Sequence, residues 1–331
     1  MITEDKNPGP LLAVSGSYWQ ACALHSGVVT GIFTAMAGKP ATADEISRRI
    51  NTDARATAML LNALAAMGLT SKKGKIYKNA GLSADFLVKD SPRYVGHMIM
   101  HHHFLVQSWS RLHESVKTGE PVRKQPQYED ETQRKSFLLG MFNLASEIAP
   151  RLASELDLKG KKHLLDLGGG PGTYAIYFCM ANPGLSATIY DLEGTRPYAM
   201  RTIEKFNMTG RIGFVAGNYL EDGINGPYDT AWLSHILHGE GPDACVKILK
   251  KVAGALDPGG VIFIHDFILD DSGDAPLFPA LFSLNMLLGT PDGQAYTETQ
   301  IKEMLHKAGF SDAYRLSFTG PNDSAIIRAR V

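Results

Sequence analysis

The sequence has few cysteines, and their spacing does not suggest that they pair. Cys22, Cys179 and Cys245 lie far apart, and none of them forms a C-x-x-C pair. A disulfide framework or a structural zinc site would need more cysteines at closer spacing. We therefore expect free thiols in a reducing compartment, which predicts a cytoplasmic protein.

Long apolar runs and an excess of one charge are also missing. No uninterrupted apolar run approaches the roughly 20 residues of a membrane-spanning helix, and residues 1–10 lack the basic-then-apolar pattern of a signal peptide. The 33 Lys and Arg are balanced by 34 Asp and Glu, which gives a net charge of -1. Proteins dedicated to nucleic acids or membrane surfaces usually carry a basic patch. We expect neither partner.

The composition is otherwise that of a globular protein with room for two domains. The chain has 331 residues, of which 44% are hydrophobic, and domains usually contain about 100–200 residues each. The first 100 residues predict three helical segments and then two short strands, at residues 11–36, 42–50, 52–67, 69–71 and 76–78. Thr42 and Glu45 have the spacing of a capping box, and Thr52 or Asp53 caps the third segment. This order is the outline of a winged helix.

A winged helix can bind DNA or join two protein chains. Arg48, Arg49 and Arg55 favour DNA, whereas the apolar first segment with Phe33 favours a protein–protein surface. Affinity for DNA depends chiefly on neutralising phosphates, and the balanced charge does not supply this. We therefore expect a winged-helix-like dimerisation domain at residues 1–100.

The pattern stays helical over residues 101–157, apart from a polar break at 119–130, and then changes. We expect 101–157 to be a helical linker that borders the active site. From residue 158 strands and helices alternate, which predicts an α/β domain at 158–331 with a mostly parallel, seven-stranded, Rossmann-like sheet. The expected strands lie at 163–167, 187–190, 212–215, 230–233, 261–265, 313–318 and 324–330. The expected helices lie at 174–180, 196–206 and 243–255.

A glycine-rich turn after the first of these strands carries the strongest functional signal. Asp166 precedes Gly168, Gly170 and Gly172, and the next residue is Thr173. Dinucleotide sites use G-x-G-x-x-G, whose last glycine makes room for helix packing beside a pyrophosphate. The spacing here is D-x-G-x-G-x-G, which favours an adenosyl amino acid, because the loop amides suit a carboxylate. The alternative is a tight strand–helix turn without a ligand.

Further polar residues follow the next strands. Asp191 lies about 20 residues beyond the loop, where an acidic side chain can accept both ribose hydroxyls, and Asn218 with Tyr219 is placed to reach adenine. Because Asp191 and Asn218 follow consecutive strands after the glycine turn, a cofactor site is favoured over a turn without a ligand. The full set of expected cofactor-binding residues is Asp166, Gly168, Gly170, Gly172, Asp191, Leu192, Gly217, Asn218, Tyr219 and Ser234.

Two histidines after the fourth strand compete for the role of general base. Histidine ionises near neutral pH and can accept a proton from a hydroxyl group, so either His235 or His238 could act. We favour His238, with Asp266 as the catalytic partner that accepts its other N–H. His265 should point to the opposite side of its strand and is expected to be structural.

The run His101-His102-His103 does not predict a metal site. On a helix the three side chains point in different directions, so they cannot meet at one ion, and no other group has ligand spacing. We expect no metal, and only His103 to line an acceptor pocket.

Together these segments resemble the caffeate/acetylserotonin-type O-methyltransferase family over nearly the whole chain. The matching stretches are Leu165–Gly172, Tyr190–Leu192, Gly217–Tyr219, Ile236–His238 and Asp257–Gly260. The resemblance implies S-adenosylmethionine (SAM) as methyl donor, S-adenosylhomocysteine (SAH) as product, His238 as base and Asp191 as ribose ligand. It also implies an acceptor pocket with Phe137, Met141, Asn285 and Met286, and a homodimer whose first helix, around Tyr18 and Trp19, reaches the partner's active site.

The chain departs from that family near the base. After the base, plant members continue with Asp-Trp, whereas this chain has Gly239 and Glu240. Asp266 replaces a Glu, and Ala295 stands where plant members have a second acidic residue that flanks the base.

The expected function is methylation of a hydroxyl on a small aromatic or polyketide-like acceptor. Methylation at carbon or nitrogen, cofactor binding without transfer, and a ligand-sensing regulator remain alternatives. Expected apolar pocket residues are Phe104, Trp109, Phe137, Met141 and Phe282.

Overall fold

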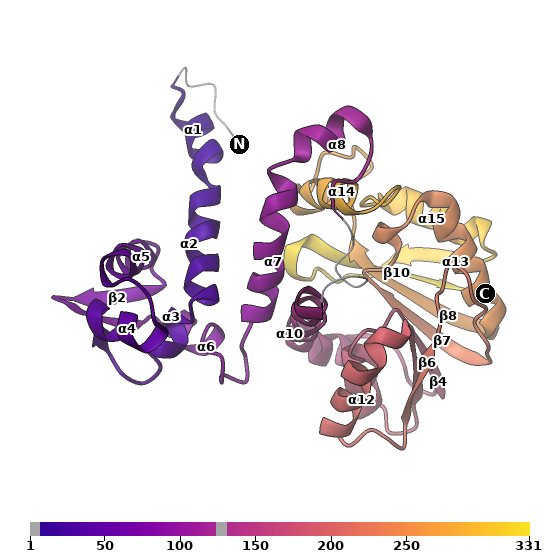
Figure 1. Ribbon diagram of the computed structural model, residues 1–331. Coiled ribbons are helices and arrows are strands. Elements are labelled where there is room, and N and C mark those ends of the chain that lie inside the picture. The colour runs from indigo at the N-terminus through magenta and orange to yellow at the C-terminus, as the bar shows by residue number, and fades with distance from the viewer. Residues whose placement is uncertain (1–6, 124–130) are drawn as a thin grey trace. The chain divides into compact units, whose positions relative to one another are not determined.

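The chain divides into two compact units, Met1–Leu105 and Val106–Val331. The computed structural model describes residues 7–123 and 131–331, so part of the polar break expected at 119–130 lies outside the described residues. Figure 1 shows the helical first unit and the second unit built on a large sheet. Each unit is described here by itself.

The first unit is helical with a small antiparallel sheet. Its elements are α1 (Gly9–Gly16), α2 (Tyr18–Val29), α3 (Ile32–Ala35), β1 (Ala41–Thr42), α4 (Ala43–Ile50), α5 (Ala54–Ala66), β2 (Thr70–Lys73), β3 (Ile76–Asn79), α6 (Gly81–Phe86) and α7 (Gly96–Trp109). The sheet order is β1-β3-β2. α7 begins in this unit and ends in the second.

Two helix starts of the first unit are those that the sequence predicts, whereas the single helical segment expected at 11–36 consists of three helices, α1 to α3. The Glu45 amide donates to Thr42 Oγ1 at 3.3 Å and the Thr42 amide donates to Glu45 Oε2 at 2.7 Å, which completes the capping box of α4. Asp53 caps α5 by accepting the Ala56 amide at 2.7 Å. The core of this unit consists of Ile32, Phe33, Met36, Ala41, Ile46, Leu61, Leu64, Tyr77 and Leu87.

The second unit alternates strands and helices. Its helices are α8 (Leu112–Thr118), α10 (Glu131–Glu155), α11 (Thr173–Ala181), α12 (Arg196–Lys205), α13 (Pro242–Ala255), α14 (Leu277–Gly289) and α15 (Glu298–Lys307), with short 3₁₀ turns η1 (Glu193–Thr195), η2 (Leu237–Gly239) and η3 (Pro321–Asp323). Its strands are β4 (His163–Leu167), β5 (Ser186–Asp191), β6 (Ile212–Ala216), β7 (Tyr228–Ser234), β8 (Leu256–Phe267), β9 (Ser311–Arg315) and β10 (Ser324–Arg330).

The seven strands form one sheet in the order β6-β5-β4-β7-β8-β10-β9. The first five are parallel, and β10 runs antiparallel to both of its neighbours. The carboxyl ends of β4 to β8 therefore meet at one edge, which is where ligands bind in open α/β sheets. The expected mostly parallel, seven-stranded fold is confirmed.

Helices cover both faces of this sheet because alternate residues of each strand point to opposite sides. Leu165, Leu233 and Ile264 pack in one core with residues of α13 and α15. Leu164 and Trp232 pack in the other with residues of α10, α11 and α12. Two apolar layers thus fix the strands whose ends carry the candidate site.

Most expected elements of the α/β domain lie within two residues of their predicted bounds, but β8 begins five residues earlier than the strand expected at 261–265, and α14 and α15 were not predicted. β4 and β10 have the predicted bounds, whereas β9 ends at Arg315, and the expected strand at 313–318 is therefore partly wrong. Phe318 is instead buried against the core beyond the strand. In the described part of the chain, every helix is too short or too polar to serve as a membrane span.

Candidate active site

The glycine turn after β4 has a backbone that only glycine adopts easily. Gly168, Gly170 and Gly172 have φ values of 63°, 54° and 79°, in the left-handed region where other residues are strained. A Cβ on Gly168 would overlap Ile236, and one on Gly172 would overlap Ile189, whereas Gly170 faces open space. Gly172 also caps α11, whose N-terminus favours a negatively charged group. The turn is therefore a cradle suited to a carboxylate.

Asp191, at the end of β5, lies against this turn. Its Oδ2 accepts the Gly170 amide at 2.8 Å, and its Oδ1 accepts the Leu192 amide at 2.7 Å and the Thr195 hydroxyl at 3.2 Å. Burial raises the pKa of Asp191, although these three hydrogen bonds oppose the shift. A carboxylate has about four acceptor sites, so one remains for a ligand hydroxyl.

Asp166 lies below the turn as a fully buried carboxyl group. It accepts the Ala175 amide at 3.3 Å, and a Cβ on Gly169 would come within 2.6 Å of its carboxyl carbon. Burial raises the pKa of Asp166 to about 7; the Ala175 hydrogen bond lowers it and the charge of Asp191 raises it further. The group therefore changes its charge near neutral pH.

The residues after β6 form a local turn. Asn218 Oδ1 accepts the Leu220 amide at 3.0 Å, and the Asn218 amide donates to Asp222 at 2.8 Å. Gly217 is closely packed against Tyr190, whose hydroxyl a Cβ would overlap. The contact of Asn218 and Tyr219 with adenine stays a prediction, and part of the Asn218 side chain is already engaged within the chain.

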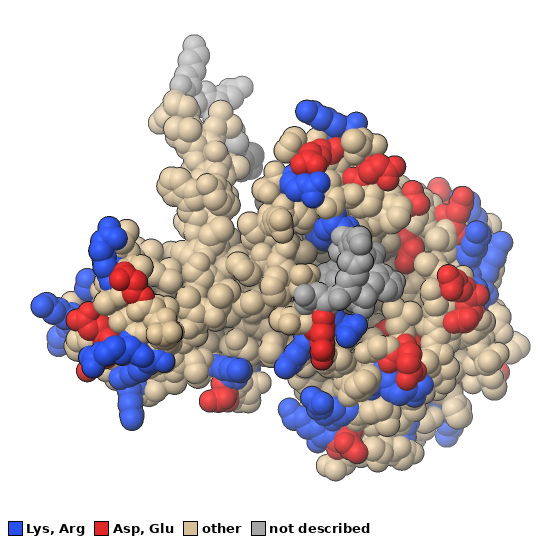
Figure 2. Space-filling view, viewed as in Figure 1, with Lys and Arg blue, Asp and Glu red and all other residues tan. Residues whose placement is uncertain are grey.

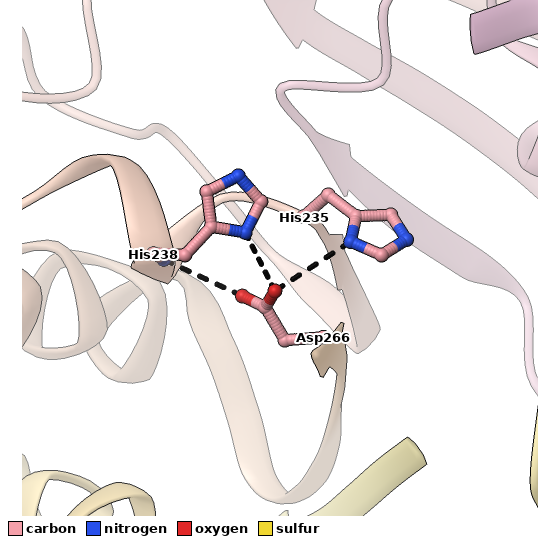
Figure 3. Close-up of side chains that lie close together, drawn as sticks. All are labelled: His235, His238 and Asp266. Carbon is pink, nitrogen blue, oxygen red and sulfur yellow. Dashed lines mark hydrogen bonds and ion pairs between the residues drawn. The ribbon is translucent and has the colours of Figure 1, made fainter. Parts of the chain in front are cut away.

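His238 and Asp266 meet as the sequence predicts. His238 lies in η2, just after β7, and Asp266 lies near the end of the neighbouring strand β8. His238 Nδ1 lies 2.6 Å from Asp266 Oδ1, and the His238 amide donates to Oδ2 at 3.4 Å (Figure 3). A neutral imidazole that donates from Nδ1 carries its acceptor lone pair on Nε2, which points away from Asp266 in Figure 3.

A second histidine approaches the same carboxylate. His235 Nδ1 lies 3.5 Å from Asp266 Oδ1 without hydrogen-bonding geometry, so this contact is electrostatic. The His235 ring lies 4.6 Å from His265 and 4.4 Å from Phe267, on a left-handed backbone with φ 58°. Burial alone would raise the pKa of Asp266, but the charges of His238 and His235 and the hydrogen bonds to Asp266 hold it well below its usual range.

His265 belongs to a separate buried network. Its Nδ1 lies 2.9 Å from Ser234 Oγ and its Nε2 lies 3.1 Å from Ser324 Oγ. Burial, together with the neighbouring His235, lowers the pKa of His265 well below its usual value, so this ring stays neutral. The hydroxyl of Ser234, which we expected on the cofactor side, is engaged in this network.

The two histidines and Asp266 also have the composition of a metal site, with ligand atoms within 4.8 Å of one another. In a tetrahedral site with bonds of about 2.0–2.1 Å, ligand atoms lie about 3.3 Å apart. The 2.6 Å between His238 Nδ1 and Asp266 Oδ1 is instead a hydrogen-bond distance. The geometry is that of a base held by a carboxylate.

Aromatic side chains surround the exposed edge of the base. The Phe282 ring, on α14, packs edge-on against His238 at 4.7 Å, and Phe267 stacks at 6.2 Å. Asn285 and Met286 follow on the same helix and are buried. These contacts place an apolar wall beside the atom that would accept a proton.

The other expected acceptor residues are less closely connected to this group. Phe137 and Met141 lie half-buried on α10 in the same unit. His103 belongs to the first unit, where its ring lies 5.8 Å from that of His25. Ala295, in place of the second acid of plant enzymes, is buried, and its amide donates to Ser283 Oγ at 2.9 Å.

Two polar groups of the site were not predicted from the sequence. Glu240 accepts the Tyr219 hydroxyl at 3.1 Å, and burial raises its pKa while the nearby His238 charge lowers it. Arg123 donates from Nη1 to Asn285 Oδ1 at 3.0 Å and from Nη2 to the Asn285 carbonyl at 3.1 Å. Glu240 was visible only as a departure from a motif, and nothing in the sequence connects Arg123 to Asn285.

Comparison with known proteins agrees with this geometry. An O-methyltransferase domain matches residues 116–311, and an O-methyltransferase dimerisation domain matches residues 12–89. The chain is 32% identical to 3-hydroxy-5-methyl-1-naphthoate 3-O-methyltransferase of Streptomyces sahachiroi, over 97% of this chain and 94% of the relative. It is 30% identical to the tetracenomycin polyketide synthesis 8-O-methyl transferase of Streptomyces glaucescens, over 98% of each chain.

A solved structure shares the same fold. Human N-acetylserotonin methyltransferase in complex with SAM aligns over 100% of this chain and 99% of its own, with a TM-score of 0.88 and 24% sequence identity. At that identity the likeness supports the arrangement of the elements, while the family match rests on the two domains and the two relatives.

Proposed function

Because the chain belongs to the O-methyltransferase family, we propose that it methylates a hydroxyl group of a small aromatic or polyketide-like acceptor, with His238 as general base. The methyl donor of the enzyme is SAM and the product is SAH. The observation that carries the proposal is the 2.6 Å contact between His238 Nδ1 and Asp266, which leaves Nε2 as the acceptor. His235, the other histidine beside Asp266, lies 3.5 Å from Oδ1 without hydrogen-bonding geometry.

The residues of the glycine turn fit the amino-acid end of the cofactor. The turn offers open space beside Gly170 and the N-terminus of α11, which suits the cofactor carboxylate. The amides of Gly168, Gly170 and Gly172 already donate to groups of the chain itself. Asp191 has one acceptor site left for a ribose hydroxyl, and Asp166 supplies a buried carboxyl group next to Gly169 of the turn. Leu192, Gly217, Asn218, Tyr219 and Ser234 remain candidates for the adenosine end.

His238 would raise the reactivity of the acceptor by removing its proton. A free phenol ionises only near pH 10, so little phenolate exists at neutral pH without a base. The sulfonium of SAM supplies an already activated methyl group. Asp266 keeps the His238 proton on Nδ1 before the transfer and stabilises the imidazolium after it. The remaining task of the chain is to align the two reactants.

An aromatic acceptor is favoured by the surroundings of the base. Phe282 and Phe267 present ring surfaces to His238, and flat ligands pack well against such walls. The two relatives above are named for a naphthoate and for polyketide synthesis, and both names specify transfer to oxygen. Methylation at carbon or nitrogen would use the same scaffold, but these relatives favour oxygen.

We also propose that the chain is a cytoplasmic homodimer joined through its first unit. The dimerisation domain matches residues 12–89. The apolar side chains of α1 and α2 are 60–69% exposed at Leu11, Leu12, Val14, Tyr18 and Trp19, although a monomer rarely exposes a contiguous apolar patch. The three cysteines are unpaired, as expected of the cytoplasm. A Trp19→Asp variant should elute as a monomer by light scattering, whereas Leu82→Asp, at an exposed site on α6, should not.

On the face seen in Figure 2, positive and negative side chains are interspersed over the larger unit, which shows no basic stripe there for phosphate contacts. The predicted winged helix lies in the other unit, where positive side chains predominate in the same view. The family match of the winged-helix region to a dimerisation domain favours the protein–protein alternative.

The proposed reaction is tested by transfer of labelled methyl groups from SAM to a panel of phenols, hydroxynaphthalenes and hydroxyanthraquinones. The wild type should methylate oxygen in at least one member, and His238→Gln should lower kcat by about 10²–10⁴-fold while binding SAM normally. His306→Gln, at an exposed histidine on α15, is the matched control. Equal activity of wild type and His238→Gln would remove His238 from the reaction, and methylated carbon or nitrogen would replace the O-transfer assignment.

A further inference from the structure

The backbone of His235 has a conformation that suits glycine better than histidine. This residue follows β7 directly and has a φ of 58°, in the left-handed region that residues with a side chain enter at a cost. Its amide donates to the His265 carbonyl at 2.8 Å, and the chain then turns into η2, which carries His238. Glycine could make the same turn without that cost. A histidine at this position therefore indicates that its side chain has a use.

The side chain of His235 is directed at Asp266. Its ring packs 4.6 Å from His265 and 4.4 Å from Phe267, the two neighbours of Asp266 on β8. Its buried Nδ1 points to Asp266 Oδ1 at 3.5 Å and has no hydrogen-bond partner among the described residues (Figure 3). A nitrogen lone pair would be repelled by a carboxylate, so the proton of the neutral ring belongs on Nδ1. His235 thus presents an N–H group to Asp266.

The Asp266 carboxylate depends on such contacts because it is buried. Its Oδ1 accepts His238 Nδ1–H at 2.6 Å and the Phe267 amide at 2.8 Å, and its Oδ2 accepts the His238 amide at 3.4 Å. In the described part of the chain, its ion-pair partners are His238 and His235, which lie on either side of Oδ1 in Figure 3. An isolated buried charge is costly, so the second histidine offsets part of this cost.

We propose that His235 is a positioning residue, whose Nδ1–H holds the Asp266 carboxylate in place against His238. With Oδ1 held between the two rings, the His238 proton stays on Nδ1, and the lone pair on Nε2 stays available for the acceptor proton. His235 acts through Asp266, whereas His238 takes the proton. This inference rests on the proposed function, because it assigns a second histidine to the site of the same reaction.

Two replacements of His235 separate the role of its N–H group from that of its backbone. Asn is among the few residues besides glycine that tolerate a left-handed backbone, and its side-chain amide keeps a donor. Glycine removes the donor and suits the backbone best. Neither His235→Asn nor His235→Gly is therefore expected to unfold the protein.

The two variants should differ in kcat at saturating SAM and acceptor. His235→Gly should lower kcat by about tenfold, which is a part of the 10²–10⁴-fold that a general base supplies. His235→Asn should retain at least about half of the wild-type kcat, because it keeps the donor. The KM for the acceptor and the affinity for SAH should change by less than about twofold in both. His306→Asn, at an exposed histidine on α15, is the matched control and should keep the wild-type kcat.

Nitrogen NMR of the SAH-loaded enzyme tests the same role without turnover. In protein with isotope-labelled histidines, the nitrogen shifts of each ring show which nitrogen carries the proton. The signals of the two rings are identified by their loss in His235→Asn and in His238→Gln. Both rings should carry a proton on Nδ1 in the wild type, and His238 should exchange between its two tautomers in His235→Gly.

A His235 ring without a proton on Nδ1, or an unchanged kcat in His235→Gly, would overturn the positioning role. So would equal losses of kcat in His235→Asn and His235→Gly, because the ring rather than its N–H group would then matter. A loss in His235→Gly as large as that in His238→Gln would also overturn it. Failure of the proposed function is distinct, because no acceptor is then methylated or His238→Gln stays fully active. The nitrogen signals would still show whether His235 faces Asp266 with an N–H group.

Discussion

Binding of the cofactor should release a proton from Asp166. Burial raises the pKa of this carboxyl group to about 7, so it is about half protonated at pH 7 and about nine-tenths protonated at pH 6. The amino-acid end of SAH carries an ammonium group, and a nearby positive charge favours the ionised carboxylate. Binding should therefore release up to about 0.5 proton at pH 7 and up to about 0.9 at pH 6.

Calorimetry of SAH binding measures this number. The apparent binding enthalpy is recorded at each pH in two buffers of different ionisation enthalpy, phosphate and Tris or phosphate and Bis-Tris. The slope of the binding enthalpy against the ionisation enthalpy of the buffer gives the number of protons exchanged. Asp166→Asn should bind SAH without releasing this proton. A zero slope for the wild type at both pH values, or the same slope in Asp166→Asn, would refute the assignment of Asp166 to the cofactor site.

The same carboxyl group predicts a dependence of stability on pH. The folded-state pKa of Asp166 lies above the value of about 3.9 for an unfolded chain. Folding therefore holds the proton more tightly, and its contribution to stability is complete below about pH 4 and lost as the pH rises towards 7. Chemical denaturation should show that Asp166→Asn loses this part of the pH dependence.

Three further predictions concern the base, the turn and the first unit. Asp266→Asn should lower kcat by about 10²-fold or more, because His238 loses its fixed tautomer. The pKa of Asp266 is depressed in the folded state, so the stability that its carboxylate contributes is present above about pH 4 and lost on acidification. The denaturation curves of the variant and the wild type should therefore converge in acid. Gly172→Ala should destabilise the protein by about 1–3 kcal/mol in urea unfolding, because of its positive φ and the Ile189 side chain. Leu61→Ala, at a fully buried site, should cost about 2–5 kcal/mol, whereas Leu82→Ala, which is 66% exposed, should leave the same transition nearly unchanged. Three results would contradict these predictions. They are a stability difference between Asp266→Asn and the wild type that persists in acid, an unchanged free energy of unfolding in Gly172→Ala, and equal losses of stability in Leu61→Ala and Leu82→Ala.

The elements of the second unit could be predicted from local sequence. Apolar runs bounded by glycine or polar residues gave the bounds of β4 and β10, and the capping signals at Thr42 and Asp53 gave two helix starts. Such signals depend on neighbouring residues only, so a single sequence contains them. The strand expected at 313–318 was misplaced because Phe318 is buried by packing on the core rather than by strand alternation.

Contacts between distant segments could be predicted only where topology determines them. Asp266 lies at the end of β8 and His238 follows the neighbouring parallel strand β7, so their meeting could be expected from the strand order. Arg123 and Asn285 are 162 residues apart and meet through a loop and a helix end, which no periodic pattern describes. The hydrogen bond of Ser234 to His265 likewise depends on how side chains pack inside the unit.

The central claim is that the glycine turn and Asp191 hold SAM in front of His238. Its most direct test is a titration of purified protein with SAM and SAH, beside Asp191→Ala and the exposed-site control Asp257→Ala. The account predicts micromolar binding, about -8 kcal/mol, by the wild type and by Asp257→Ala, and a loss of at least about tenfold in Asp191→Ala, or about 1.4 kcal/mol. Undiminished binding by Asp191→Ala, or no binding of either ligand to the wild type, would contradict it.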